Sequence, residues 1–183
     1  QHPELGQRQF GLGPEVWIER DDFTEVPPKG FFRLFPGNKV RLKYGMVVEC
    51  TGCEKDAEGR VVQVLARVVP DTKSGTPGAD AVKVKGTITW VGVHEAVPAT
   101  VVLYDRLFTE AQPDAGGRDF REVLNPLSKQ PVQAWMEPAL ATAQREQRFQ
   151  FERHGYFVAD RIDHEPGRPV FNRITTLRDS WAA

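Results

Sequence analysis

Short runs in which apolar and polar residues alternate occur along much of the chain. In the clearest one, residues 39–43, Val40 and Leu42 alternate with three cations, the pattern of a strand that buries one face. Runs of β type also occupy residues 15–18, 46–50, 61–69, 84–91, 99–108, 148–159 and 169–177. The polar segment 54–59 separates two of these runs and predicts a hairpin turn, whereas the Gly- and Pro-containing segment 70–80 predicts a surface loop.

The segment from Gln112 to Glu146 has a different pattern. Two parts of it, residues 119–124 and 138–146, are predicted to be short helices, the second with Pro138 at a first-turn position. Residues 1–14 are rich in Gly, Gln and Pro and are predicted to be a linker or an arm. Many short strands with one brief helical segment indicate an all-β fold, for which we expect two β-barrels with one or two short helices.

Composition narrows the class of protein. The 183 residues are 40% hydrophobic and 27% charged, which is ordinary for a soluble globular protein. No apolar run approaches the roughly 20 residues that cross a bilayer, and the start of the sequence has no signal-peptide pattern. Two cysteines cannot form a disulfide framework, so a cytoplasmic location is expected. The first residue is Gln rather than Met, so we also expect the sequence to begin inside a longer polypeptide.

The net charge of −1 is uninformative, but the distribution of charge is not. Between Val26 and Val48 there is no Asp or Glu. Cations and aromatic rings are interleaved in this stretch: Lys29, Phe31, Phe32, Arg33, Phe35, Lys39, Arg41, Lys43 and Tyr44. Cations that meet phosphates and rings that stack on unpaired bases are what single-stranded RNA recognition requires. The alternative interpretation is a solvated basic surface over an aromatic core.

Cys50 and Cys53 form a CxxC pair, the most prominent candidate for a metal or redox site. A structural zinc site needs four ligands, and the sequence contains no second pair. The pair also lies where we expect a strand to end in a turn, whereas a thioredoxin-like pair begins a helix. The favoured interpretation is therefore structural, without a metal.

The sequence contains no catalytic pattern. There is no GxSxG motif, no phosphate-binding GxxxxGK loop and no cysteine in a recognisable nucleophile context. The pairs Asp21–Asp22 and His94–Glu95 are isolated and are typical of surface turns. We therefore select no candidate catalytic residue.

Residues 148–157 combine aromatic and hydrogen-bonding side chains near the end of the sequence. Together, a Gln amide and an Arg fork can satisfy the donors and acceptors of a base's Watson–Crick edge. In a regular strand Gln150 and Arg153 would face opposite sides, so joint use requires a bulge or a strand end. The alternative is an amphipathic strand with a polar outer face.

Several blocks of the sequence, taken in order, resemble the glutaminyl-tRNA synthetase family. VVLYDRLF at 101–108, FQFERHGYF at 149–157, PVFNR at 169–173 and LRDSW at 177–181 are similar to the family's C-terminal blocks. PPKGFFRL at 27–34, VRLKY at 40–44 and KVKGTITWV at 83–91 are similar to its earlier anticodon-domain blocks. The resemblance runs from about His2 to Trp181.

The resemblance implies two β-barrels of the type shared with a 5S-RNA-binding ribosomal protein, one inserted in the other. Residues 15–93 would form the distal barrel and 94–183 most of the proximal barrel, whose first strands we expect to precede Gln1. The implied function is anticodon recognition within a glutamine–tRNA ligase, in protein biosynthesis. Neither an HIGH-like nor a KMSKS-like motif occurs, so the ATP and Mg²⁺ of the reaction would be bound elsewhere, and no cofactor is expected in this fragment. The expected partners are the tRNA(Gln) anticodon loop and the ligase's own N-terminal catalytic domain, in a monomer.

The resemblance also assigns the anticodon contacts. Arg41, helped by Lys43, would contact the first base. Gln150 and Arg153 would contact the second base, and Arg33 the third.

Three further positions bear on the resemblance. Ser180 lies where relatives can carry Thr, near the pocket for the second base. Gly30 and Phe32 depart from the pattern, because some members have Gln and Lys there that also touch the anticodon.

Alternative functions remain open. Glutamyl-tRNA synthetases of the archaeal and eukaryotic kind share the barrel architecture, although the blocks at 149–157 and 177–181 favour the glutaminyl enzyme. The second alternative is a stand-alone RNA-binding barrel. The third is a small zinc or redox protein built on the CxxC pair.

Overall fold

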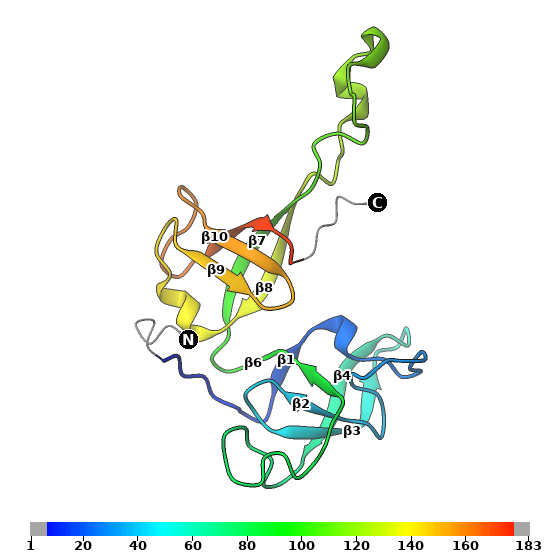
Figure 1. Ribbon diagram of the computed structural model, residues 1–183, viewed down its shortest axis with the longest axis vertical. Coiled ribbons are helices and arrows are strands. Elements are labelled where there is room, and N and C mark those ends of the chain that lie inside the picture. Colours follow the sequence, from blue (N-terminus) through cyan, green and yellow to red (C-terminus); the bar gives the residue numbers. More distant parts are fainter. Residues whose placement is uncertain (1–6, 178–183) are drawn as a thin grey trace. The chain divides into compact units, whose positions relative to one another are not determined.

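The computed structural model describes residues 7–177, and in this range the chain is built mainly from short strands (Figure 1). It divides into two compact units. The inserted unit is Gly11–His94, and the flanking unit consists of residues 7–10 and 95–177. The predicted all-β class is confirmed; the closure of the sheets into barrels stays a prediction.

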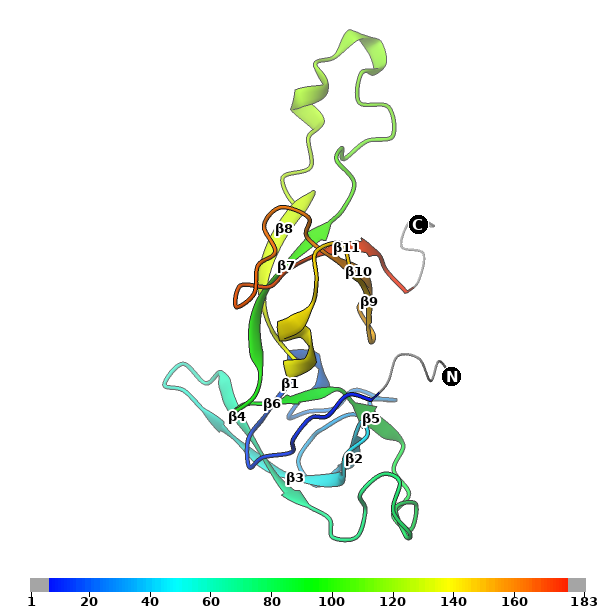
Figure 2. The ribbon, with the colours of Figure 1, turned by 90° about the vertical axis from the view of Figure 1, so that its left-hand side faces the viewer.

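The inserted unit contains a four-stranded and a two-stranded sheet. The four-stranded sheet has the order β4-β3-β2-β5, and the small sheet pairs β1 with β6. The strands are β1 (Val16–Ile18), β2 (Lys39–Leu42), β3 (Val47–Lys55), β4 (Val61–Val68), β5 (Gly86–Ile88) and β6 (Trp90–Gly92). All neighbours are antiparallel except β2 and β5, which run parallel (Figure 2).

The core of the inserted unit confirms the face pattern predicted for residues 39–43. Val40 and Leu42 are buried, whereas Lys39 is exposed on the other side of β2. The core around them is completed by Phe23, Leu34, Val48, Cys50 and Ile88. Removal of these apolar side chains from water is what fixes which face of β2 carries the cations.

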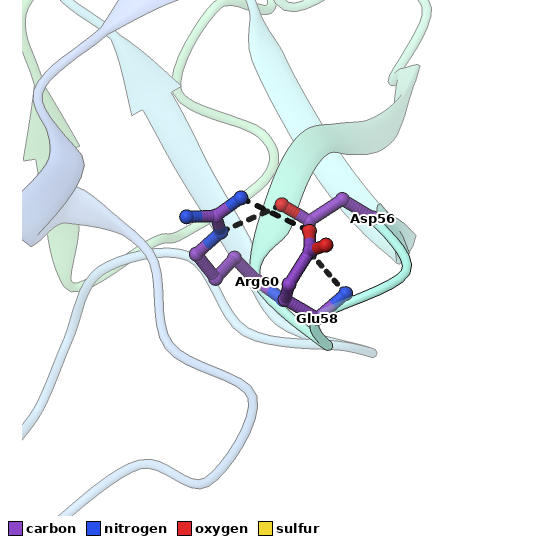
Figure 3. Close-up of polar contacts among 3 residues, drawn as sticks. All are labelled: Asp56, Glu58 and Arg60. Carbon is purple, nitrogen blue, oxygen red and sulfur yellow. Dashed lines mark hydrogen bonds and ion pairs between the residues drawn. The ribbon is translucent and has the colours of Figure 1, made fainter.

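The predicted hairpin of the inserted unit is present as β3 and β4, closed by a turn that its side chains hold together (Figure 3). One carboxylate oxygen of Asp56 accepts the backbone N–H of Glu58 and that of Arg60, at 3.1 and 2.8 Å. Its other oxygen accepts Arg60 Nε at 2.7 Å, and Glu58 accepts Arg60 Nη2 at 3.0 Å. These hydrogen bonds, first of all that from the Arg60 side chain, hold the pKa of Asp56 below its usual value.

The flanking unit contains one five-stranded sheet of order β8-β7-β11-β10-β9. Its strands are β7 (Val97–Tyr104), β8 (Lys129–Met136), β9 (Arg148–Phe151), β10 (Gly155–Ala159) and β11 (Val170–Thr175). Phenylalanine rings dominate its core: the Phe151 and Phe157 rings stack at 4.4 Å, and the Phe171 ring packs edge-on against Phe151 at 5.3 Å. Edge-on and offset ring packing of this kind adds to the stabilisation from burial alone.

The described helices are all short 3₁₀ helices of three to five residues. They are η2 (Arg20–Asp22), η3 (Ala115–Gly117), η4 (Phe120–Val123) and η5 (Pro138–Thr142). The helix predicted at 119–124 is present as η4, where Asp119 caps the turn by accepting the Arg121 N–H. The helix predicted at 138–146 starts as expected at Pro138 but ends at Thr142. Among the described residues, no helix is long and apolar enough to cross a membrane.

Three predictions about strands are corrected by the structure. Residues 129–136 form β8, which the sequence pattern misses because this run contains Pro131 and polar residues. β8 is an edge strand, where Pro is tolerated. The run at 84–91 is divided into β5 and β6. β3 continues to Lys55 through a bulge after Cys50, so the CxxC pair lies inside a strand and not at its end.

Candidate nucleic-acid interface

Arg41 lies on the outer face of β2, and its guanidinium holds the loop predicted at 70–80. Nη1 donates to the Thr72 carbonyl at 2.8 Å and to Ser74 Oγ at 3.3 Å. Nη2 donates to the Ala79 carbonyl at 2.6 Å. Three of the five N–H groups of this arginine are therefore used within the protein, and the side chain is partly exposed.

The loop that Arg41 holds is itself well anchored. The Thr72 side chain is buried, donates to the Val69 carbonyl at 2.7 Å and accepts the Val47 N–H at 3.0 Å. Ser74 Oγ donates to the Gly45 carbonyl at 2.9 Å. Arg41 therefore joins β2 to a fixed loop, and its guanidinium has a defined position.

Lys43 follows directly after β2 and is fixed through its backbone. Its N–H donates to the Ile88 carbonyl at 2.9 Å, and its carbonyl accepts Trp90 Nε1 at 2.9 Å. Lys43 Nζ lies 5.3 Å from the centroid of the exposed Tyr44 ring. A cation and an accessible ring are thus presented together at the end of the strand.

Arg33 has a structural partner. Its Nη1 lies 3.0 Å from Oδ1 of Asp22, whose side chain is fully buried, and it also donates to the Asp21 carbonyl at 3.2 Å. A buried carboxylate is stable only when it is paired and hydrogen-bonded. The Arg33 side chain is still 40% exposed, so it can meet solvent or a ligand while it holds Asp22.

The second-base candidates lie at the end of the hairpin formed by β9 and β10. Gln150 is exposed on β9, opposite Tyr156, and within residues 7–177 its amide makes no hydrogen bond. Arg153 lies in the turn between the strands, with a φ of 71°. The strand end that joint use of Gln150 and Arg153 requires is therefore present. Ser180 lies outside the described residues.

Sequence reasoning misses two cations, Lys83 and Lys85, in the segment before β5. The parallel pairing of β5 with β2 brings this segment to the aromatic stretch, and Lys85 Nζ lies 5.2 Å from the centroid of the Phe32 ring. This segment and the aromatic stretch together line an open groove of about 480 Å³. The alternation of Lys83, Val84 and Lys85 is the signal available in the sequence, but it does not reveal the pairing.

Two models of one protein family match the chain. Both are described as "tRNA synthetases class I (E and Q), anti-codon binding domain", and they match residues 1–69 and 87–160. The chain belongs to this anticodon-binding family.

Glutamine–tRNA ligases are among the relatives of this anticodon-binding chain. Those of Ralstonia nicotianae and Cupriavidus taiwanensis are each 66% identical to it over 179 residues, or 98% of its length. That of Bordetella pertussis is 62% identical over 181 residues, or 99%. The chain spans 31% of the length of each of these relatives.

Membership of the anticodon-binding family confirms the predicted resemblance, while the base assigned to each residue stays a prediction. The structure places Arg33, Arg41 and Lys43 in the inserted unit, near or on β2. It places Gln150 and Arg153 together at one hairpin end of the flanking unit.

The CxxC pair of this anticodon-binding chain is integrated into the core. Cys50 is buried in β3, and Cys53 packs against the same cluster. Burial raises the pKa of both thiols, and the Glu25 carboxylate raises that of Cys53 further, which disfavours the reactive thiolate. No group of three or more His, Cys, Asp or Glu residues within 7–177 could hold a metal ion. The burial of Cys50 and the raised pKa values of both thiols support the structural interpretation.

Proposed function

We propose that the chain recognises the anticodon of tRNA(Gln) as the C-terminal region of a glutamine–tRNA ligase. The observation that carries this proposal is the 66% identity to glutamine–tRNA ligases over 98% of the chain. In this proposal ATP and Mg²⁺ act at the catalytic part of the ligase, and the chain selects the tRNA that is charged there. A cytoplasmic, monomeric ligase is part of the same proposal.

The hairpin end offers the clearest chemistry for reading a base. The Gln150 amide presents both a donor and an acceptor, and the Arg153 guanidinium presents a planar fork of donors. A β9 strand that ends at Phe151 allows both side chains to act on one ligand, although they are separated by an odd number of residues. The packed rings of Phe149 and Phe151 support the strand from its other face.

Substitution of Arg153 in the full-length ligase tests the proposal. Arg153→Ala removes a base-reading fork, and we expect it to lower kcat/KM for the normal tRNA by about 5- to 150-fold, the equivalent of 1–3 kcal/mol. The preference for that tRNA over one with a substituted middle anticodon base should also decrease. Aminoacylation kinetics with the two tRNAs measure both effects.

Arg148→Ala is the matched control, because Arg148 is an exposed arginine on the same hairpin. Loss of this charge should lower kcat/KM for both tRNAs to a similar, small extent. If Arg153→Ala and Arg148→Ala have the same effect on both tRNAs, Arg153 does not read a base and the proposed role of the hairpin end is wrong.

A further inference from the structure

The groove between the Phe31–Phe35 segment and the Lys83–Gly86 segment has walls of two kinds. Its aromatic wall is formed by Phe31, Phe32 and Phe35, and half of the Phe32 surface is exposed. Its cationic wall is formed by Lys39, Lys83 and Lys85. No lining residue is Asp or Glu.

The backbone fixes the distance between the two walls. A Cβ atom at residue 86 would overlap the Phe32 carbonyl oxygen, so Gly86 is what allows the segment before β5 to approach the aromatic stretch. The floor is held by the Asn38 amide, which donates to the Arg33 carbonyl at 2.6 Å, and by Gly37 N–H, which donates to the Cys50 carbonyl at 2.9 Å. The groove is thus preformed by main-chain contacts.

Two of the groove's cations are available for a ligand. Lys39 forms an ion pair with Glu49, because the Glu49 Oε2 atom lies 3.8 Å from the Lys39 Nζ atom. Lys83 and Lys85 are exposed and form no ion pair with any described residue. An exposed ring with the Lys85 ammonium group 5.2 Å from its centroid, and with Lys83 lining the same groove, matches one base and the phosphate attached to it.

We propose that this groove binds one unpaired nucleotide of the tRNA, with the base against Phe32 and the phosphate at Lys83 and Lys85. The proposal rests on the anticodon recognition proposed above and adds a binding groove to it. Arg33 does not line the groove and pairs with Asp22, so Phe32, Lys83 and Lys85 would add contacts that the assigned residues do not make. An acidic peptide would engage the lysines but would leave the three rings unused, so the groove favours RNA.

Equilibrium binding of an anticodon stem–loop to the full-length ligase tests the groove. Lys83→Ala/Lys85→Ala should weaken binding and reduce the slope of log affinity against log salt by about 0.7, the value for one phosphate of a single strand. Phe32→Leu keeps an apolar side chain without a ring and should weaken binding by about 5- to 100-fold. Phe32→Tyr restores a ring and should recover most of that loss. Lys129→Ala, at an exposed lysine of the flanking unit outside the groove, is the control for lost charge.

The outcomes separate this proposal from the one on which it rests. If the wild type prefers the cognate stem–loop and Arg153→Ala reduces that preference, but the groove variants bind like Lys129→Ala, the groove proposal alone is wrong. If the wild type has no preference for the cognate loop, the proposed function fails and the groove proposal with it. If the groove variants lose binding of polyglutamate but not of RNA, the ligand is an acidic peptide and the nucleotide is excluded. Thermal unfolding of each variant verifies that the fold is intact.

Discussion

The two groups of candidate anticodon contacts differ in what their side chains do within the protein. In the inserted unit, Arg33 pairs with a fully buried carboxylate and Arg41 donates three hydrogen bonds to one loop. In the flanking unit, Gln150 and Arg153 lie exposed at a hairpin end, on a backbone that other residues support. The first group combines folding with candidate recognition, whereas the second presents exposed side chains at the end of a hairpin.

This difference determines how substitutions in each group must be interpreted. A loss of tRNA binding after substitution of Arg33 or Arg41 combines a missing contact with a disturbed site, because the same guanidinium does both. A similar loss after substitution of Gln150, whose amide makes no hydrogen bond within residues 7–177, reports on contact with RNA more directly. Comparable kinetic effects in the two groups would therefore have different causes, and stability measurements are needed to separate them.

The largest effect on stability is expected at the ion pair between Arg33 and Asp22. Arg33→Ala leaves a fully buried carboxylate without this partner, and we expect a loss of about 2–3 kcal/mol in the free energy of unfolding, less than for a completely buried pair because Arg33 is 40% exposed. Urea denaturation measures it. The double variant Arg33→Ala/Asp22→Asn should lose less than the sum of the two single variants, and strict additivity would show that the pair is not coupled.

The next effect is expected at Arg41. Arg41→Ala removes three hydrogen bonds to the loop, so we expect a loss of about 2 kcal/mol and faster amide hydrogen exchange in residues 72–79. Arg41→Lys keeps the charge but not the planar fork. It should therefore restore only part of the lost stability and only part of the protection of residues 72–79 from hydrogen exchange. Arg153→Ala is the comparison and should change the free energy of unfolding by less than about 0.5 kcal/mol. An equally large loss at Arg153 would remove the distinction between the two groups.

Much of the fold was predictable where side-chain pattern reports burial directly. The alternation at 39–43 gave the buried face of β2, and the polar segment 54–59 gave the hairpin of β3 and β4. β8 was not predictable in the same way, because an edge strand tolerates Pro131 and polar residues that a central strand would exclude.

Of the candidate site, the sequence predicts residue types better than their partners. The hydrogen bonds of Arg41 go mainly to backbone carbonyls, which every residue has, so no sequence pattern marks them. Lys83 and Lys85 reach Phe32 through a parallel pairing between strands far apart in the chain. Gln150 and Arg153 were selected by resemblance, and the structure adds the strand end that allows them to act together.

The smallest effect is expected at Glu49, which compensates a cation in the inserted unit without lining the groove. Its carboxylate accepts Arg67 Nη2 at 3.1 Å and lies 3.8 Å from Lys39 Nζ, and these contacts, the Arg67 hydrogen bond first, hold its pKa below the usual value. The carboxylate is therefore charged at neutral pH, and its interactions are lost only as the pH falls through that lowered pKa. Glu49→Gln should free Lys39 and raise stem–loop affinity by about twofold at low salt, with little change at high salt. Glu58→Gln, which removes a carboxylate paired with Arg60 at the hairpin turn, is the matched control. An equal gain from both substitutions would mean that overall charge, and not the release of Lys39, sets the affinity.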